Sequence, residues 1–188
     1  DCFVQIMNNN LQTERLNIRW WRLKDMASLR KYASDKEVAK MAGWPPVTNW
    51  LKALDRVTIG YPKPWCFALV DRQSQKAIGS LSFMTKQEAH IEIKEDELEV
   101  GYWIAREFWG QGLVAEAAQR VFSEIFETTG IQRIYVVIES SNTQSLRVQA
   151  KLGFVYNRTE YMDLNCENRK TPYYIGVLDE SDWRKCSL

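Results

Sequence analysis

Residues 98–126 constrain the possible fold more than any other part of this chain. Residues 98–105 predict a β-strand that runs into two glycines with one residue between them, Gly110 and Gly112. The residues after Gly112 predict an amphipathic helix, because their apolar side chains recur at the spacing of a helix with one buried face. These apolar residues are Val114, Ala117, Ala118, Val121, Phe122, Ile125 and Phe126. The segment therefore predicts a strand, a glycine turn and a core-facing helix in direct succession.

Such a unit is suited to binding a phosphate or pyrophosphate. The first turn of a helix has backbone N–H groups without internal partners and carries the positive end of the helix dipole. Glycines just before it allow the backbone to approach a bulky anion. The chain has no P-loop string, and no acidic residue ends a strand about 20 residues further on, as a dinucleotide fold requires. The glycines alone are equally compatible with a turn that only packs the helix against its strand.

A second informative segment covers residues 142–154, which follow a predicted strand at residues 133–139. Asn142 is a favourable N-cap residue, and Gly153 is predicted to end the helix. The side chains predicted to face the core from this helix are Leu146, Ala150 and Leu152.

Together, the two segments resemble the GNAT superfamily of acyl-CoA-dependent N-acetyltransferases. The first is similar to its motif A, the pyrophosphate loop, and the second to its motif B, which has the pattern N-x-x-S/A and ends K-x-G-F. Residues 13–19 (TERLNIR) and 99–104 (EVGYWI) resemble the opening and a strand of the RimJ/RimL-like subgroup. Two positions depart from the pattern. Glu107 stands where motif A usually has Gln or Arg, and Gln149 stands where many members have a Tyr that is taken to protonate the leaving thiolate.

The resemblance implies one α/β (α+β) acyltransferase domain over residues 13–188, after a flexible leader at residues 1–12. It implies a mixed, mostly antiparallel central sheet of roughly six to seven strands, with flanking helices and a splayed strand pair that holds acyl-CoA. Residues 87–97 are acidic and predict a solvated loop. The remaining predicted strands are residues 15–21, 65–70, 76–84, 154–164 and 171–178, and the remaining predicted helices are residues 24–34 and 47–59.

The resemblance also implies an acetyl-CoA site without a metal. The strand end at residues 104–106 would pair with the pantetheine arm like an added strand. The residues expected to bind the co-substrate are Ile104, Ala105, Arg106, Trp109, Gly110, Gln111, Gly112, Leu113, Val114, Asn142 and Ser145. Arg147 and Lys151 are further candidates for the adenosine phosphate or are simply solvent-facing.

Acetyl transfer needs a neutral amine, and it needs stabilisation of the oxyanion and the thiolate. Ser145 becomes the candidate near the sulfur, because Gln149 cannot act as the motif B tyrosine does. Glu99, on the central strand, is either the general base and an amine contact or a residue that orients the strand. Glu160 matches a position that the RimL-like pattern uses for the acceptor, unless it is an ordinary strand residue. Trp44, between a glycine and two prolines, is the tryptophan best placed to bind an acceptor.

The leading hypothesis is transfer to a protein or peptide N-terminal amine by direct attack in a ternary complex. A small-molecule acceptor, such as a polyamine, amino acid or aminoglycoside, stays open because residues 88–99 carry several carboxylates. A non-catalytic acyl-CoA-binding or interaction domain is the alternative from another class.

Composition excludes several other functions. The net charge of +1 gives no basic stripe for nucleic acid, and no apolar run is long enough to span a membrane. The four cysteines, Cys2, Cys66, Cys166 and Cys186, are scattered and cannot form a zinc site with the single histidine, His90. They are expected to be free thiols in a cytoplasmic protein, which would be a monomer or a homodimer.

Overall fold

The computed structural model describes residues 10–61, 64–164 and 168–186, which form one mixed sheet of eight strands. The strand order is β1-β2-β3-β4-β5-β6-β8-β7, and all neighbours are antiparallel except the parallel pair β5 and β6. The strands are β1 (Asn10–Gln12), β2 (Leu16–Trp20), β3 (Cys66–Asp71), β4 (Ala77–Met84), β5 (Glu97–Ile104), β6 (Arg133–Glu139), β7 (Val155–Met162) and β8 (Thr171–Asp179). The helical segments are η2 (Leu23–Asp25), α1 (Met26–Ala33), α2 (Lys36–Met41), α3 (Trp50–Asp55), η3 (Arg56–Gly60), η4 (Arg106–Phe108), α4 (Leu113–Thr128), α5 (Thr143–Lys151) and α6 (Glu180–Cys186).

The predicted strands are confirmed to within a few residues at each end. The sheet has eight strands rather than the expected six to seven, and the strand that was not predicted is β1. Residues 10–12 were predicted to belong to a flexible leader, but they pair with β2, and Leu11 is fully buried. The leader prediction is therefore wrong for these three residues, and residues 1–9 lie outside the described part.

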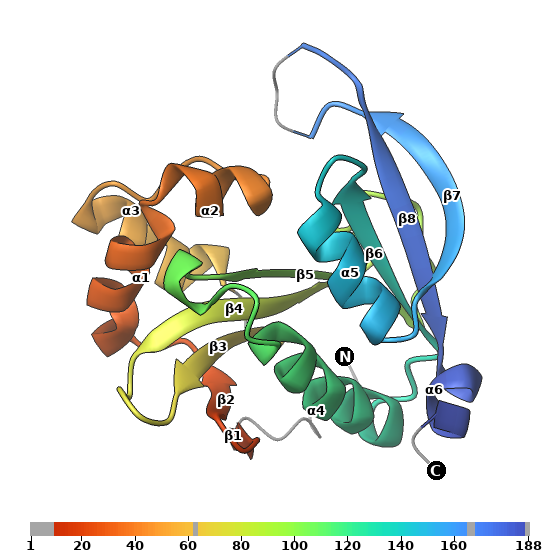
Figure 1. Ribbon diagram of the computed structural model, residues 1–188, viewed down its shortest axis with the longest axis horizontal. Helices are drawn as coiled ribbons and strands as arrows, with labels where there is room; N and C mark the ends of the chain where they lie inside the picture. Colours follow the sequence, from red (N-terminus) through yellow and green to blue (C-terminus); the bar gives the residue numbers. More distant parts are fainter. Residues whose placement is uncertain (1–9, 62–63, 165–167, 187–188) are drawn as a thin grey trace.

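Helix α4 is confirmed as the main core-facing helix. All seven residues predicted for its apolar face are buried, together with Leu113. Phe122 lies at the centre of an aromatic cluster, with ring centroids 6.0 Å from Phe83 and 5.9 Å from Phe154. The helix packs against β1, β2, β4 and β5, so it holds the strands of the first half of the sheet together (Figure 1).

Helical segments cover both faces of β5. Successive side chains of a strand point to opposite faces. The Trp103 indole of β5 donates to the hydroxyl of Tyr61, just after η3, whereas the neighbouring Tyr102 hydroxyl contacts α5. The segments from α1 to η3 therefore lie on one face of β5, and α5 lies on the other.

The sheet opens between β5 and β6. These strands pair only from Glu97–Val100 to Arg133–Val136. Beyond that point, β5 stays paired with β4 and β6 stays paired with β8, and Figure 1 shows β5 and β6 running apart. The expected splayed strand pair is therefore present, and residues 101–104 have one edge free of any strand.

Several local features differ from the predictions. Helices α2 and α6 were not predicted, and the helix expected at residues 47–59 begins only at Trp50 and ends in the π-turn η3. Ala150 is exposed, and Gln149 takes the buried position on α5 instead. The acidic segment 87–97 is not simply a solvated loop, because Ile91 and Ile93 are buried against β6 and β8. None of the described helices has the length and apolarity needed to cross a bilayer.

Candidate active site

Two cavities meet where β5 and β6 separate. The first, of about 320 Å³, lies between the end of β5, the glycine turn, the start of α4 and the outer part of α5; we call it the glycine-loop cavity. The second, of about 600 Å³, extends between η3, the inner part of β5, β6 and β8; we call it the aromatic cavity. The residues that line both are Met41, Ala42, Tyr102, Trp103, Asn142 and Ser145. A ligand in one cavity can therefore touch a ligand in the other.

The glycine turn gives the first cavity its anion-binding end. Gly110 and Gly112 have φ angles of 75° and 77°, in the left-handed region that glycine adopts without strain. Gly112 is the N-cap of α4 and has no side chain to cap it, and the first helical bond runs from Glu116 N–H to the Gly112 carbonyl. The N–H groups of residues 113–115 are therefore left for a ligand, at the positive end of the helix dipole. Leu113 and Val114, which were predicted to bind the co-substrate, line the cavity.

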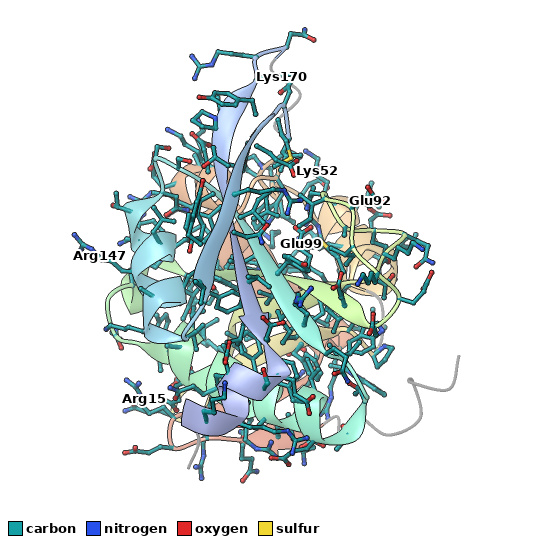
Figure 2. The ribbon with its side chains drawn as sticks, turned by 90° about the vertical axis from the view of Figure 1, so that its right-hand side faces the viewer. Arg15, Lys52, Glu92, Glu99, Arg147 and Lys170 are labelled. Carbon is teal, nitrogen blue, oxygen red and sulfur yellow. The ribbon has the colours of Figure 1, made fainter. Side chains whose placement is uncertain are left out.

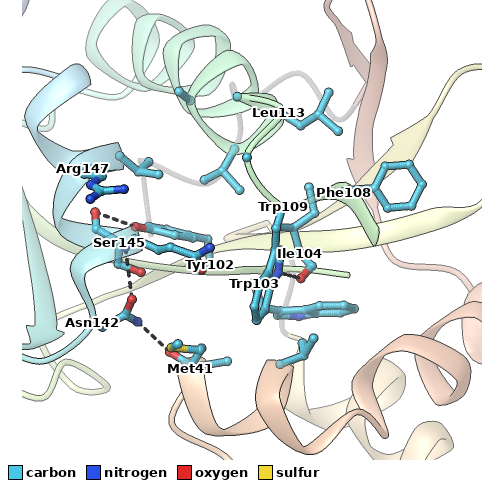
Figure 3. A pocket seen from close by; sticks show the side chains of 18 of the residues that line it. Met41, Tyr102, Trp103, Ile104, Phe108, Trp109, Leu113, Asn142, Ser145 and Arg147 are labelled. Atoms are coloured by element: carbon cyan, nitrogen blue, oxygen red, sulfur yellow. Dashed lines mark hydrogen bonds between the residues drawn. The ribbon is translucent and has the colours of Figure 1, made fainter. Parts of the chain in front are cut away.

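The end of β5 forms one wall of this cavity (Figure 3). The Trp109 indole donates a hydrogen bond of 2.9 Å to the Ile104 carbonyl at the free edge of the strand. Three residues predicted to bind the co-substrate do not line the cavity. Ala105 is buried in the sheet, where its N–H bonds to the Ile78 carbonyl of β4.

The other two predicted residues are turned away by contacts of their own. The Arg106 guanidinium forms an ion pair of 2.6 Å with Asp35 at the start of α2. The Gln111 carbonyl accepts a hydrogen bond from Arg15, and its side-chain amide donates to the Glu107 carbonyl. These contacts fix the glycine turn in place, and a co-substrate contact of Arg106 or of the Gln111 backbone N–H stays a prediction.

Asn142 and Ser145 lie at the junction of the cavities. The Asn142 Oδ1 atom accepts the Ser145 N–H at 3.1 Å and caps α5, while its Nδ2 donates to the Met41 carbonyl at 3.5 Å (Figure 3). The side chain of Asn142 therefore links the start of α5 to the end of α2 across the junction. Arg147 and Lys151 are exposed on α5 and line the glycine-loop cavity, and Figure 2 shows Arg147 projecting from the helix.

The Tyr102 hydroxyl contacts Gln149, the residue that departs from the motif B pattern. This hydroxyl accepts a hydrogen bond of 2.8 Å from Gln149 Nε2 and donates to the Ser145 carbonyl at 3.4 Å. Burial raises the pKa of this hydroxyl, so it stays protonated at neutral pH. The departure at Gln149 is thus accompanied by a hydroxyl from β5, which the sequence reasoning did not identify.

Aromatic rings form much of the second cavity. Trp44 lines it, as expected for an acceptor wall, and meets Trp103 edge to face at 6.0 Å. The Arg56 guanidinium lies over the Trp44 ring at 5.0 Å and over the Tyr61 ring at 5.7 Å. Cys66 is a buried free thiol here, and burial raises its pKa to about 11. Cys2 and Cys166 lie outside the described residues.

Glu99 lies on the floor of the aromatic cavity, paired with His90. Its Oε1 is 2.6 Å from His90 Nδ1, and its Oε2 accepts the backbone N–H of His90 at 2.7 Å. The hydrogen bond to Glu99 raises the pKa of His90 and outweighs the opposing effect of burial. Both side chains line the cavity, and Figure 2 shows Glu99 in the interior of the molecule.

Glu160 is the predicted site residue that the structure does not bring to the others. It lies on β7, forms an ion pair of 2.6 Å with Arg158, and lines neither cavity. Of the carboxylates in residues 88–99, only Glu88 and Glu99 line the aromatic cavity, where β6 adds Glu139. The described residues contain no group of three or more His, Cys, Asp or Glu side chains that could hold a metal ion.

A family model described as an acetyltransferase (GNAT) domain matches residues 15–155. The chain belongs to the GNAT acetyltransferase family. It is 29% identical over 151 residues to the uncharacterised N-acetyltransferase p20 of Bacillus licheniformis, which covers 77% of this chain and 81% of that protein.

Solved structures agree in fold with this GNAT chain. The crystal structure of a GNAT-family acetyltransferase from Bacillus anthracis has a TM-score of 0.78 at 23% identity, covering 92% of this chain and 99% of that one. The ribosomal-protein-S5-alanine acetyltransferase from Vibrio fischeri has a TM-score of 0.69 at 19% identity, covering 94% and 99%. The protein is thus an acetyl-CoA-dependent N-acetyltransferase, and its acceptor is a separate question.

Proposed function

We propose that this enzyme transfers the acetyl group of acetyl-CoA to the α-amine of a protein or peptide N-terminus, by direct attack while both substrates are bound. The observation that carries the proposal is the junction of the two cavities at the open end of β5. A thioester reaching the junction from the glycine-loop cavity would meet an amine entering from the aromatic cavity. Holding both reactants in contact replaces a bimolecular encounter with an oriented one.

The glycine-loop cavity would hold acetyl-CoA along its length. The pyrophosphate would bind the free N–H groups at the start of α4, beside Gly110 and Gly112. The pantetheine arm would pair with the free edge of β5 as an added strand, next to Ile104. Arg147 and Lys151 line this cavity from α5 and would meet the adenosine phosphate. Asn142 would contact the pantetheine near the thioester.

The chemical step needs a proton acceptor on the amine side and a hydroxyl on the sulfur side. On the amine side, the paired side chains of Glu99 and His90 line the aromatic cavity, and this pair would take up the proton of the acceptor. Ser145 and Tyr102 stand at the junction, where the thiolate leaves, and the Tyr102 hydroxyl is held there by Gln149. Glu160 has no part in this scheme, because it lies outside both cavities.

An α-amine suits this site as the acceptor. Its pKa is about 7.7–8.0, compared with about 10.4 for a lysine side chain, so little base strength is needed to supply the neutral amine. The RimJ/RimL-like opening at residues 13–19 and the likeness to the Vibrio fischeri protein support a ribosomal or other protein N-terminus. The polyamine alternative is weakened because Lys40 and Arg56 line the same cavity as its carboxylates.

The first test is thermal unfolding with and without acetyl-CoA, with adenosine diphosphate as the control. A ligand at 100 times its Kd adds about 2.7 kcal/mol of stability, which for a chain of this size raises the Tm by roughly 5–10 °C. No shift at millimolar acetyl-CoA would refute the co-substrate site. The acceptor is then sought by following CoA release with peptides that have a free or a blocked N-terminus, and with polyamines and aminoglycosides.

Three variants separate an enzyme from a non-catalytic binder. Glu99→Gln and Ser145→Ala should lower kcat, by about 10²-fold or more for the first, while both keep the acetyl-CoA-induced Tm shift. Glu160→Gln is the matched control, since it removes a carboxylate outside both cavities, and it should keep both activity and binding. Turnover that falls equally in Glu160→Gln would contradict the assignment of the site.

A further inference from the structure

In the pair formed by His90 and Glu99, both side chains line the cavity, and the histidine is much the more exposed of the two. The side chain of Glu99 is 3% exposed and that of His90 is 43% exposed. Both carboxylate oxygens are bonded to His90, one to the ring and one to the backbone N–H. A substrate amine, or a water bound to it, therefore reaches the imidazole before it reaches the carboxylate.

The bonds to Glu99 also decide which ring nitrogen is available. A carboxylate at 2.6 Å from Nδ1 keeps the proton on that nitrogen, which leaves the Nε2 lone pair free in the neutral ring. None of the described residues forms a hydrogen bond with Nε2. This is the arrangement in which a buried carboxylate fixes the tautomer of a histidine base.

We propose that His90 is the general base of acetyl transfer and that Glu99 is its positioning residue; this rests on the proposed function. Nε2 takes a proton from the acceptor ammonium, directly or through one water. The neutral nitrogen then attacks the thioester carbon, the C–N bond forms, and the C–S bond breaks with its electron pair on sulfur. The attacking nitrogen loses its second proton as the thiolate takes one up, so the net proton released leaves through His90.

The charges around His90 fit an acceptor that is only weakly basic. Besides Glu99 and His90, the charged side chains lining the cavity are Lys40 and Arg56, which are positive, and Glu88 and Glu139, which are negative, so neither sign dominates. Cys66, Tyr61 and Tyr102 in the lining are neutral at pH 7, because burial raises the pKa of all three groups. The hydrogen bond to Glu99 raises the pKa of His90 from its ordinary value toward that of an α-ammonium.

The test compares two substitutions of the same residue pair. In His90→Asn, the amide nitrogen can replace Nδ1 as the donor to Glu99, but nothing replaces Nε2. With a peptide that has a free N-terminus, this variant should lose about 10²–10⁴-fold in kcat, keep its KM for acetyl-CoA, and lose the acid limb of the pH profile. In Glu99→Gln, the acid limb should remain and move to lower pH. An active His90→Asn with the wild-type pH profile would overturn the proposal.

A second measurement does not depend on the acceptor. His90 is the single histidine of the chain, so its ring gives one unambiguous signal in an NMR titration. The signal should titrate above the ordinary value of about 6.5 in the wild type and lower in Glu99→Gln. Equal titration in both proteins would overturn the pairing. A wild type that binds acetyl-CoA but acetylates no amine would overturn both the proposed function and the role of His90. If the wild type and His90→Asn are both active, only the role of His90 is overturned.

Discussion

Asn142 has two separable roles, and two substitutions can tell them apart. Its Oδ1 caps α5 by accepting the Ser145 N–H at 3.1 Å. Its Nδ2 donates one N–H to the Met41 carbonyl at 3.5 Å, and we expect the second N–H to bond pantetheine at the junction. Asn142→Ala removes both groups. Asn142→Ser keeps a side-chain oxygen that can cap the helix but has no amide nitrogen to offer a ligand.

The expected magnitudes follow from these contacts. Losing a cap costs about 1 kcal/mol, so Asn142→Ala should lower the Tm by roughly 2–4 °C in a chain of this length. Asn142→Ser should lower it by less than half as much. Losing one neutral hydrogen bond to the ligand costs about 1 kcal/mol, so both variants should bind acetyl-CoA roughly fivefold more weakly. Thermal unfolding measures the first effect and calorimetric titration with acetyl-CoA the second.

Two results would refute the reasoning. Wild-type affinity in both variants would mean that Asn142 only caps α5 and does not touch the co-substrate. A Tm loss in Asn142→Ser as large as in Asn142→Ala would mean that the cap oxygen is not what stabilises the start of α5.

Three further predictions concern the surroundings of the junction. A Cβ on Gly79 would collide with the backbone at the end of β5, so Gly79→Ala should lose about 1–3 kcal/mol of stability and bind acetyl-CoA more weakly. The control is Gly101→Ala, whose Cβ would meet only a methionine methyl at 3.5 Å and which should unfold like the wild type. Equal Tm values for the two variants would contradict this prediction. Tyr102→Phe should lower kcat by about tenfold or more and leave acetyl-CoA affinity within about twofold, and an unchanged kcat would remove the hydroxyl from the mechanism. Because the pKa of His90 is raised on folding, its pairing with Glu99 should stabilise the wild type relative to Glu99→Gln below pH about 6.5. This difference in the free energy of unfolding should disappear as the pH rises through the folded pKa. Urea titrations at several pH values measure it, and a difference that grows with pH would refute the prediction.

The sequence was sufficient for the parts of the fold that repeat a pattern. The apolar spacing after Gly112 predicts a helix that the structure confirms as α4, and the strand predicted at residues 133–139 is β6 with the same bounds. The glycine turn and the Asn142 cap are also local, since each acts within one turn of its own helix. This is why the glycine-loop cavity could be anticipated in most of its residues.

The remainder depends on contacts between distant residues. Strand β1 is three residues long and exists because it pairs with β2, which no local pattern signals. The exposure of Ala150 and the burial of Gln149 follow from the Tyr102 hydroxyl on β5, 47 positions away from that glutamine. The pairing of His90 with Glu99 was not predicted, because a single histidine in an acidic segment predicts a solvated loop and only the fold brings the two residues together. The buried isoleucines on either side of Glu92 were the one available signal.

The short parallel ladder between β5 and β6 has a consequence for the size of the ligand. Helix α5 begins soon after β6 ends, and the glycine turn begins soon after β5 ends. The four residue pairs between β5 and β6 therefore set the distance between the start of α5 and the glycine turn. A slip of one residue in that ladder would displace α5 by about 3.3 Å along the strand direction. It would also turn every side chain of β6 to the other face, which the buried core forbids. The ladder thus fixes the separation between a phosphate at one end and a thioester at the other, and a ligand with a longer or shorter arm would miss one of its two contacts.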